Sequence, residues 1–299
     1  MRKNKSSGGR RSVSLSLPYE WRMLLPLLIV MVAILAYPLL YSFWISFRNI
    51  EITKPHQNQF VGLVQYAKVW QDPAYWNVLK NTFGFVCMAV SMELVLGMIL
   101  ALCLKNMKRY RNVTRAILLT PMFITPIAVG LMFRYLLSTQ LGLVPALLHL
   151  FGISIDFFSA NMALFSLSMI DVWQWTPFML LMLLAGLENL PEEPYEAARV
   201  DGAGSWYILT RITIPLMSPV MIVAVLIRAL DAMKVFEYVY AITRGGPGTA
   251  TETLQYYVYK TGFGYYNLSK ASAVAWTVVI FVMIVLILIL WRSTRGEQR

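Results

Sequence analysis

The sequence has little of the material from which catalytic and metal sites are built. Its 299 residues include only two histidines and two cysteines. His56 and His149 form no metal-type pair, and neither zinc-ligand spacing nor an HExxH pattern occurs. The dipeptide Gly-Lys is absent, so there is no GxxxxGK[ST] loop to hold phosphates. We therefore predict that this chain is not an enzyme, binds no metal or other cofactor, and does not hydrolyse ATP by itself.

Charged residues are also scarce, at 14% of the chain against about 25% in soluble domains. Six apolar runs explain the deficit, and each is close to or above the ~20 residues that cross a bilayer. We expect an all-α integral membrane protein with six transmembrane helices. Both cysteines fall on the second run, about 24 Å apart by helical rise, too far for a disulfide. The runs are Met23–Phe47, Phe83–Leu104, Ala116–Leu137, Met162–Leu187, Ile212–Leu230 and Ala271–Trp291.

The net charge of +11 is distributed as membrane topology requires, which argues against a nucleic-acid partner. Basic residues gather before the first run, between the second and third, and after the last. The link 138–161 contains no Lys or Arg. This positive-inside pattern predicts a multi-pass protein of the bacterial cytoplasmic (inner) membrane with both termini in the cytoplasm. The basic groups are Arg2, Lys3, Lys5, Arg10, Arg11, Arg22, then Lys105, Lys108, Arg109, Arg111, Arg115, and finally Arg292, Arg295 and Arg299.

The chain divides into four parts along its length. Residues 1–22 form a basic cytoplasmic tail rich in Ser, Gly and Arg, which we expect to be disordered. Residues 23–76 hold the first transmembrane helix and an outside segment. Residues 77–291 hold a core of five helices with a polar cytoplasmic loop, and residues 292–299 form a second cytoplasmic tail.

The polar loop, LPEEPYEAARVDGAGSWYILTRITIP, differs from an ordinary connection between membrane helices. Glu192 and Glu193 suit a helix start, where negative charge favours the helix dipole. Tyr195–Val200 is good helix-forming sequence, Gly202 is a natural left-handed stop, and Ser205 can cap a second helix. The pattern predicts a helix, a glycine turn and a second helix beside the membrane, which suits docking on another protein.

Ionisable residues at membrane depth are costly and therefore mark candidate functional positions. Two are isolated carboxylates in the second and fourth runs, and four recur every three residues near the end of the fifth. The four can form a self-neutralising ladder on one helix face. Alternatively, they line a pathway for a hydroxylated substrate. The two carboxylates are Glu93 and Asp171, and the four are Arg228, Asp231, Lys234 and Glu237.

Trp173, Gln174 and Trp175 place two aromatic rings beside an amide, close to Asp171. Such a mixture suits sugars, whose apolar CH faces stack on aromatic rings while their hydroxyls bond polar groups. Aromatic residues that face lipid or the protein core would give the same pattern. With the charged residues, this yields eight candidates for a substrate pathway: Glu93, Asp171, Trp173, Gln174, Trp175, Asp231, Lys234 and Glu237.

One motif resembles a known family. Glu196-Ala197-Ala198, then Gly202, then Ile212-x-Ile214-Pro215 is similar to the EAA motif of permease subunits in bacterial binding-protein-dependent ABC importers. The family pattern is EAA, three residues, Gly, nine residues and I-x-L-P, so Ile214 replaces the usual leucine. The stretches WQWTPFMLLMLLAGLENLPEEPYEAARVDGA and RGGPGTATETL resemble the sugar-importing, MalF-like branch.

The resemblance implies an ABC type I importer permease that forms half of a pathway for a sugar or related polyol. The cytoplasmic loop 190–215 would couple it to a separate ATPase. Implied partners are a second homologous permease, two ATP-binding subunits that hold ATP and Mg, and an extracytoplasmic solute-binding protein. The chain itself would contact the sugar substrate and membrane lipid, and no nucleic acid. The residues assigned to ATPase coupling are Glu196, Ala197, Ala198, Arg199, Asp201, Gly202, Ile212 and Pro215.

The alternative from a different class is a stand-alone secondary transporter of a small polar solute. Such proteins usually show internal repeats or paired broken helices. No repeat at a fixed period is visible here. A self-sufficient transporter would also have no need for a cytoplasmic docking loop.

Overall fold

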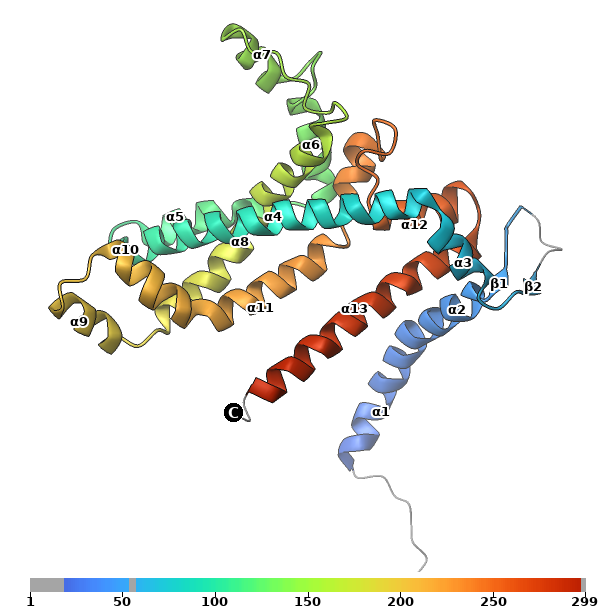
Figure 1. Cartoon of the computed structure of the whole chain (residues 1–299), viewed down its shortest axis with the longest axis horizontal. Coiled ribbons are helices and arrows are strands. Elements are labelled where there is room, and N and C mark those ends of the chain that lie inside the picture. Colours follow the sequence, from blue (N-terminus) through green and yellow to red (C-terminus); the bar gives the residue numbers. More distant parts are fainter. Residues whose placement is uncertain (1–18, 54–57, 297–299) are drawn as a thin grey trace, which may run out of the picture.

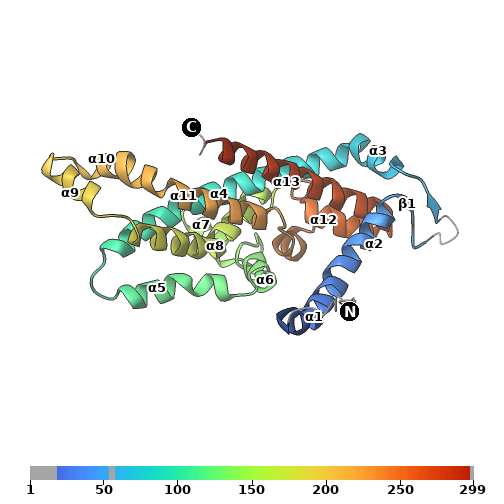
Figure 2. The same ribbon diagram turned by 90° about the horizontal axis from the view of Figure 1, so that it is seen from below.

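The structure is a computed structural model that describes residues 19–53 and 58–296. His56, most of the 1–22 tail and the end of the 292–299 tail therefore lie outside the described residues. The molecule is helical and elongated, with α4 (Pro73–Asn106) along its long axis (Figure 1). Both views place α9 (Glu193–Val200) at one end and β1 (Arg48–Asn49) at the other (Figure 2).

The first part of the chain is a long helix followed by a small outside segment. α1 (Tyr19–Met31), the π-helical turn η1 (Val32–Ala36) and α2 (Tyr37–Ser46) run on continuously. β1 then pairs antiparallel with β2 (Gln59–Phe60), and α3 (Val64–Gln71) leads into α4. The next elements are α5 (Arg111–Leu119), η3 (Thr120–Phe123), α6 (Pro126–Leu136), α7 (Leu143–Leu150) and α8 (Ala163–Glu188).

The second part begins with the polar loop 190–215 and ends with the longest helix after α4. In chain order, its elements are α9, α10 (Ser205–Tyr207), η4 (Ile208–Thr213), α11 (Ile214–Ala232), η5 (Val239–Thr243), α12 (Leu254–Tyr259), η6 (Lys260–Gly264) and α13 (Leu268–Gly296).

The core is built on the pair α4 and α8, which pack along much of their length. Gly97 of α4 lies where the two backbones come closest. A Cβ built there would stand 2.8 Å from Met179 Cγ and 3.2 Å from the backbone nitrogen of Leu180. Glycine is thus required for this close approach, as small residues commonly are between membrane helices. α11 packs against both helices and completes the core.

The expected spans are largely present. Within the described residues, four helices are long and apolar enough to cross a membrane: Met23–Ser46, Pro73–Asn106, Ala163–Glu188 and Ser205–Ala232. A bent pair, 111–136, would make a fifth. α13 covers the sixth expected run, with an apolar part at Leu268–Ile284. The multi-pass, all-α class is confirmed, and the count of six stays a prediction.

The first span differs from the others in its lack of packing. None of its apolar stretch is buried inside the chain, although it is the most apolar of the four spans. Its main neighbour is α13, the last helix of the sequence. By contrast, 61% of the α8 stretch is buried, and that span is the least apolar.

The third expected span, Ala116–Leu137, is broken in the structure. The segments Arg111–Phe123 and Pro126–Leu136 meet at an angle of 91°. Pro121 is the second residue of η3 and Pro126 is the first residue of α6, and the intervening Ile124 and Thr125 are extended. Proline disfavours helical geometry in the residue before it, which favours the break at Thr125.

Asp72 fixes the N-terminal end of α4. Its carboxylate accepts hydrogen bonds from the Ala74 amide at 2.9 Å, from Lys270 Nζ at 2.6 Å and from Tyr257 Oη at 2.9 Å. Burial raises the pKa of the Asp72 carboxyl, but these bonds outweigh it and hold the pKa below its ordinary value. The residue therefore caps α4 and ties it to α12 and α13.

The close approach at Gly97 gives a first prediction. Gly97→Ala should lower the stability of the purified protein by about 1–3 kcal/mol, because the new methyl group overpacks a contact with the α8 backbone. Thermal unfolding in detergent, followed by size-exclusion chromatography, measures the loss. Gly84→Ala on the same helix is the matched control, since its nearest atom would be 3.7 Å away. Equal stability of the two variants would contradict the role of Gly97.

Candidate functional site

A buried arginine joins the three core helices. Arg228 of α11 donates from Nε and Nη2 to the two oxygens of Glu93 on α4, both at 2.7 Å. Nη2 also donates to Asp171 Oδ2 on α8 at 2.7 Å, and Nη1 donates to Asp231 Oδ2 at 2.8 Å. The arginine is 1% exposed, Glu93 is fully buried, and Asp171 is 3% exposed. We call these four residues the charge cluster.

Burial of the charge cluster is tolerated only because its members form ion pairs and hydrogen bonds with one another. A charge buried in low dielectric loses several kcal/mol of hydration, which a well-formed ion pair returns. The planar guanidinium supports this because it presents two parallel donors to one carboxylate, as lysine cannot. Every nitrogen of Arg228 is engaged. The cluster therefore holds α4, α8 and α11 in one fixed arrangement at membrane depth.

A polar cavity of about 220 Å³ opens beside this cluster. Asp171 and Asp231 belong to both. Trp175 forms an aromatic wall, and its ring centroid lies 5.2 Å from the Arg228 guanidinium carbon, within cation–π range. Lys234 and Glu237 also line the cavity, together with Pro126 from the bend in the third span. Five of the eight predicted pathway residues thus meet at one hollow: Asp171, Trp175, Asp231, Lys234 and Glu237.

The other three predicted pathway residues lie elsewhere. Glu93 is behind the cavity, bound to Arg228. Trp173 is 40% exposed, packs edge-on against Phe133 and lines an apolar groove on another face. Gln174 is fully buried: its Nε2 donates to the Ile124 carbonyl at 2.7 Å and its Oε1 accepts from Tyr238 Oη at 2.6 Å. It therefore satisfies the carbonyl that the bend leaves free.

The charged residues near the end of the fifth run do not form a continuous helical ladder. Only Arg228 and Asp231 pair in the expected i, i+3 manner. α11 ends at Ala232, and Lys234 lies in the turn that follows. The helix thus ends before all four charged residues have been placed on it. Lys234 and Glu237 follow the end of the helix and line the cavity.

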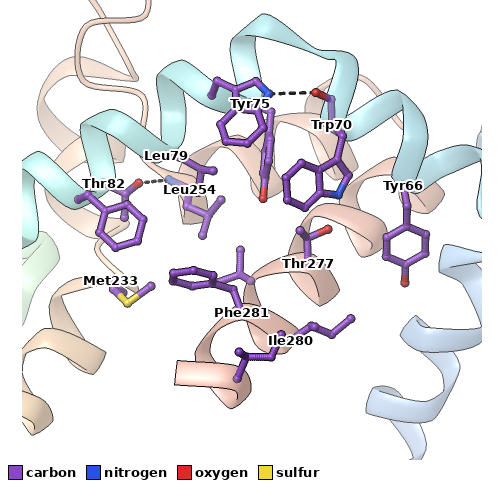
Figure 3. Close-up of a pocket in the computed structure, with 14 residues that line it drawn as sticks. Tyr66, Trp70, Tyr75, Leu79, Thr82, Met233, Leu254, Thr277, Ile280 and Phe281 are labelled. Atoms are coloured by element: carbon purple, nitrogen blue, oxygen red, sulfur yellow. Dashed lines mark hydrogen bonds between the residues drawn. The ribbon is translucent and has the colours of Figure 1, made fainter. Parts of the chain in front are cut away.

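A second hollow, of about 550 Å³, is almost entirely apolar (Figure 3). Tyr66, Trp70 and Tyr75 line it from α3 and α4, and Thr277 and Phe281 line it from α13 (Figure 3). It contains no charged side chain and none of the predicted pathway residues. The polar cavity is therefore the better candidate for a hydroxylated solute.

The cytoplasmic loop has the predicted helix, turn and helix. α9 begins at Glu193, with Glu193 and Glu196 in its first turn, and Gly202 has a φ of +74°. The expected cap is wrong: Gly204 occupies the N-cap position and Ser205 is the first helical residue. The second helix is also not separate, because Ser205–Ala232 continues into the membrane as one helix.

The tip of the loop is exposed. Of the predicted coupling residues, Glu196, Ala197, Arg199, Asp201, Gly202 and Pro215 are exposed, Ile212 is half-buried and Ala198 is buried. A polar concavity of about 530 Å³ lies between α9 and α10. Two apolar side chains that the motif does not include stand out from the tip: Val200 is 87% exposed and Trp206 is 77% exposed.

The base of the loop is braced against the core, which the sequence did not reveal. Lys105, at the end of α4, donates to the Leu187 carbonyl at 2.9 Å and lies 5.5 Å from the Tyr195 ring centroid. Tyr195 in turn donates to Thr213 Oγ1 at 3.1 Å. Arg111 forms an ion pair with Glu188 at the end of α8. The brace links the ends of α4, α8, α9 and η4.

The charge cluster generates a second prediction. Arg228→Gln should cost about 3–5 kcal/mol of stability, because it leaves buried carboxylates without a counter-charge. The yield of monodisperse protein and its melting temperature in detergent report the loss. The double variant Glu93→Gln with Arg228→Gln should recover a substantial part, since one unpaired charge is removed. No loss in the single variant would show that the cluster is not structural.

Comparison with known proteins places these features in a family. The family model described as "Binding-protein-dependent transport system inner membrane component" matches residues 93–295. The chain is 36% identical, over 267 residues, to the trehalose/maltose transport system permease protein MalF of Thermococcus litoralis, covering 88% of each chain. It is 31% identical over 259 residues to the trehalose transport system permease protein SugA of Mycobacterium tuberculosis, covering 87% of this chain and 81% of the relative.

A solved structure has the same fold. It is a bacterial ABC transporter involved in import of the acidic polysaccharide alginate, and the two chains superpose with a TM-score of 0.80 at 23% identity, covering 92% of this chain and 95% of the other. The family match begins at Glu93 of the charge cluster and includes the whole cytoplasmic loop. The chain thus belongs to the family of inner-membrane permease components of binding-protein-dependent ABC importers.

Proposed function

We propose that this chain carries a sugar or related polyol across the bacterial inner membrane, with the polar cavity as part of its pathway. The observation that supports this most directly is the grouping of Trp175 with four ionisable side chains in one hollow at the end of α11. An aromatic ring offers stacking to the CH face of a sugar, and the polar groups offer hydrogen bonds to its hydroxyls. The curated relatives named for trehalose and maltose transport support the same class of solute.

The cytoplasmic loop is proposed to couple transport to a separate ATPase. Its tip combines exposed apolar side chains with a polar concavity, a composition typical of protein contact surfaces. Its base is tied by Lys105 and Tyr195 to the ends of the core helices. A force applied at the tip would therefore reach α4 and α8 directly, because the links are short and the helices are rigid.

The remaining parts of the importer follow from the family. We propose that a second homologous permease completes the pathway and that two ABC subunits bind ATP and Mg. A solute-binding protein would deliver the substrate outside, and both termini would lie in the cytoplasm. Purification of the tagged chain from its native membrane in mild detergent tests this set: mass spectrometry should find a Walker-motif ATPase and a second permease. Recovery of the chain alone would favour a self-sufficient transporter.

The turn at Gly202 gives a further prediction. Gly202→Asp should abolish ATPase binding and uptake, because it puts a charged side chain on the docking surface, while the membrane helices remain folded. A Cβ at Gly202 meets nothing within 4 Å, so no clash inside the chain is expected. Co-purification of the ATPase and uptake into proteoliposomes are the measurements.

The matched control is Gly152→Asp. Gly152 has nearly the same backbone conformation, with a φ of +73° against +74° at Gly202, and it too has open space around it. It lies in the link 138–161, away from the cytoplasmic loop. The two variants therefore carry the same backbone strain, and only the first should lose the ATPase. Equal loss in both would mean that strain, and not docking, is responsible.

A further inference from the structure

Acidic side chains outnumber basic side chains at the polar cavity. Four carboxyl groups lie in the cavity wall or directly behind it, against two cationic groups. The carboxyl groups are Glu93, Asp171, Asp231 and Glu237, and the cations are Arg228 and Lys234. Trp175 and Tyr238 complete the polar part of the lining. No other charged residue of the described chain lines this hollow.

Arg228 is not available to an incoming anion. It is 1% exposed, and Nε, Nη1 and Nη2 all donate to carboxylates of this chain at 2.7–2.8 Å. A substrate carboxylate or phosphate would have to displace one of them and leave it buried without a partner. Since an unpaired buried charge costs several kcal/mol, the exchange is unfavourable. All three guanidinium nitrogens are therefore already bonded within the chain.

Lys234 is the one cation that reaches the cavity wall, and acidic residues flank it. Asp231 precedes it by three residues and Glu237 follows it by three, and all three line the hollow. Asp231 keeps 49% of its side chain exposed despite its bond to Arg228, so its charge faces the open cavity. An anion attracted by the ammonium would meet two carboxylates that line the same cavity, and like charges repel strongly in a partly desolvated site.

We infer that the substrate carries no negative charge: the cavity takes an uncharged sugar or an amino sugar and rejects uronates, sugar phosphates and sulfonates. This rests on the proposed function of the cavity. A neutral ring would stack on Trp175 and donate its hydroxyl protons to the carboxylates. Carboxylates accept up to about four hydrogen bonds each, which matches a polyhydroxylated ligand. An ammonium group on the ring would gain further from the surplus charge.

Three monosaccharides that share a ring and differ in charge test this inference. The tagged chain, purified with its partner subunits and placed in lipid nanodiscs at pH 7, is titrated with glucose, glucuronate and glucosamine in the absence of a solute-binding protein. Saturation-transfer difference NMR reports weak binding of each. We expect glucuronate to bind about tenfold more weakly than glucose, and glucosamine to bind at least as well as glucose.

Two charge variants assign the effect to this cavity. Glu237→Gln removes a negative charge outside the charge cluster. It should lower the ratio of the glucose affinity to the glucuronate affinity about threefold. Lys234→Gln removes a positive charge, is the matched control of opposite sign, and should raise that affinity ratio by a similar factor. Both are compared as ratios within one preparation, so a difference in yield does not affect the result.

Failure of the site and failure of its charge preference give different results. Trp175→Ala should abolish the saturation-transfer signal of all three sugars. If it has no effect, or if the unmodified importer saturates none of them, then the cavity is not a sugar site and both proposals fall. If glucose and glucuronate bind equally well, or if the two charge variants shift the ratio in the same direction, the site stands and the inference about charge is wrong.

Discussion

One guanidinium group determines the arrangement of the membrane core. Arg228 bonds carboxylates on α4 and α8 as well as on its own helix, and it does so at a depth where none of these charges is stable alone. The three helices must therefore come together with the geometry that satisfies it. The position of the polar cavity follows, because Asp171 and Asp231 serve both the cluster and the cavity wall. The residues that join the core helices thus also supply part of the charge around the cavity.

The two ends of the molecule are attached to the core by different sets of bonds. The base of the loop 190–215 is bonded to the core through Lys105, Tyr195 and Thr213, whereas Val200 and Trp206 are exposed at its tip. At the opposite end, Asp72 ties α4 to α12 and α13 through bonds that its lowered pKa preserves down to acidic pH. The stability from these bonds is complete above the ordinary pKa of an aspartate and is lost only as the pH falls through the lower folded value.

The sequence predicted what depends on neighbours along the chain. The helix from Tyr195 to Val200 and the turn at Gly202 were foreseen because helix stops act locally. The apolar run Ala116–Leu137 predicted one span, but the run by itself does not show that the chain bends by 91° between Phe123 and Pro126. The charge cluster was missed as a unit because Arg228 and Glu93 are 135 residues apart. One clue was present: an isolated arginine in one apolar run and isolated carboxylates in two others each require a partner.

The unpacked first span has a consequence for the biogenesis of the protein. It is made well before its main neighbour, α13. During synthesis of the residues between them, the helix with which it mainly packs does not yet exist. The apolar character of the first span is the greatest of the four and needs no protein contact to keep it in the bilayer. The less apolar α8 can instead rely on α4, which is already in place when α8 emerges. The two spans that are made first, Met23–Ser46 and Pro73–Asn106, are thus also the most apolar of the four, and they are made when the fewest packing partners are available.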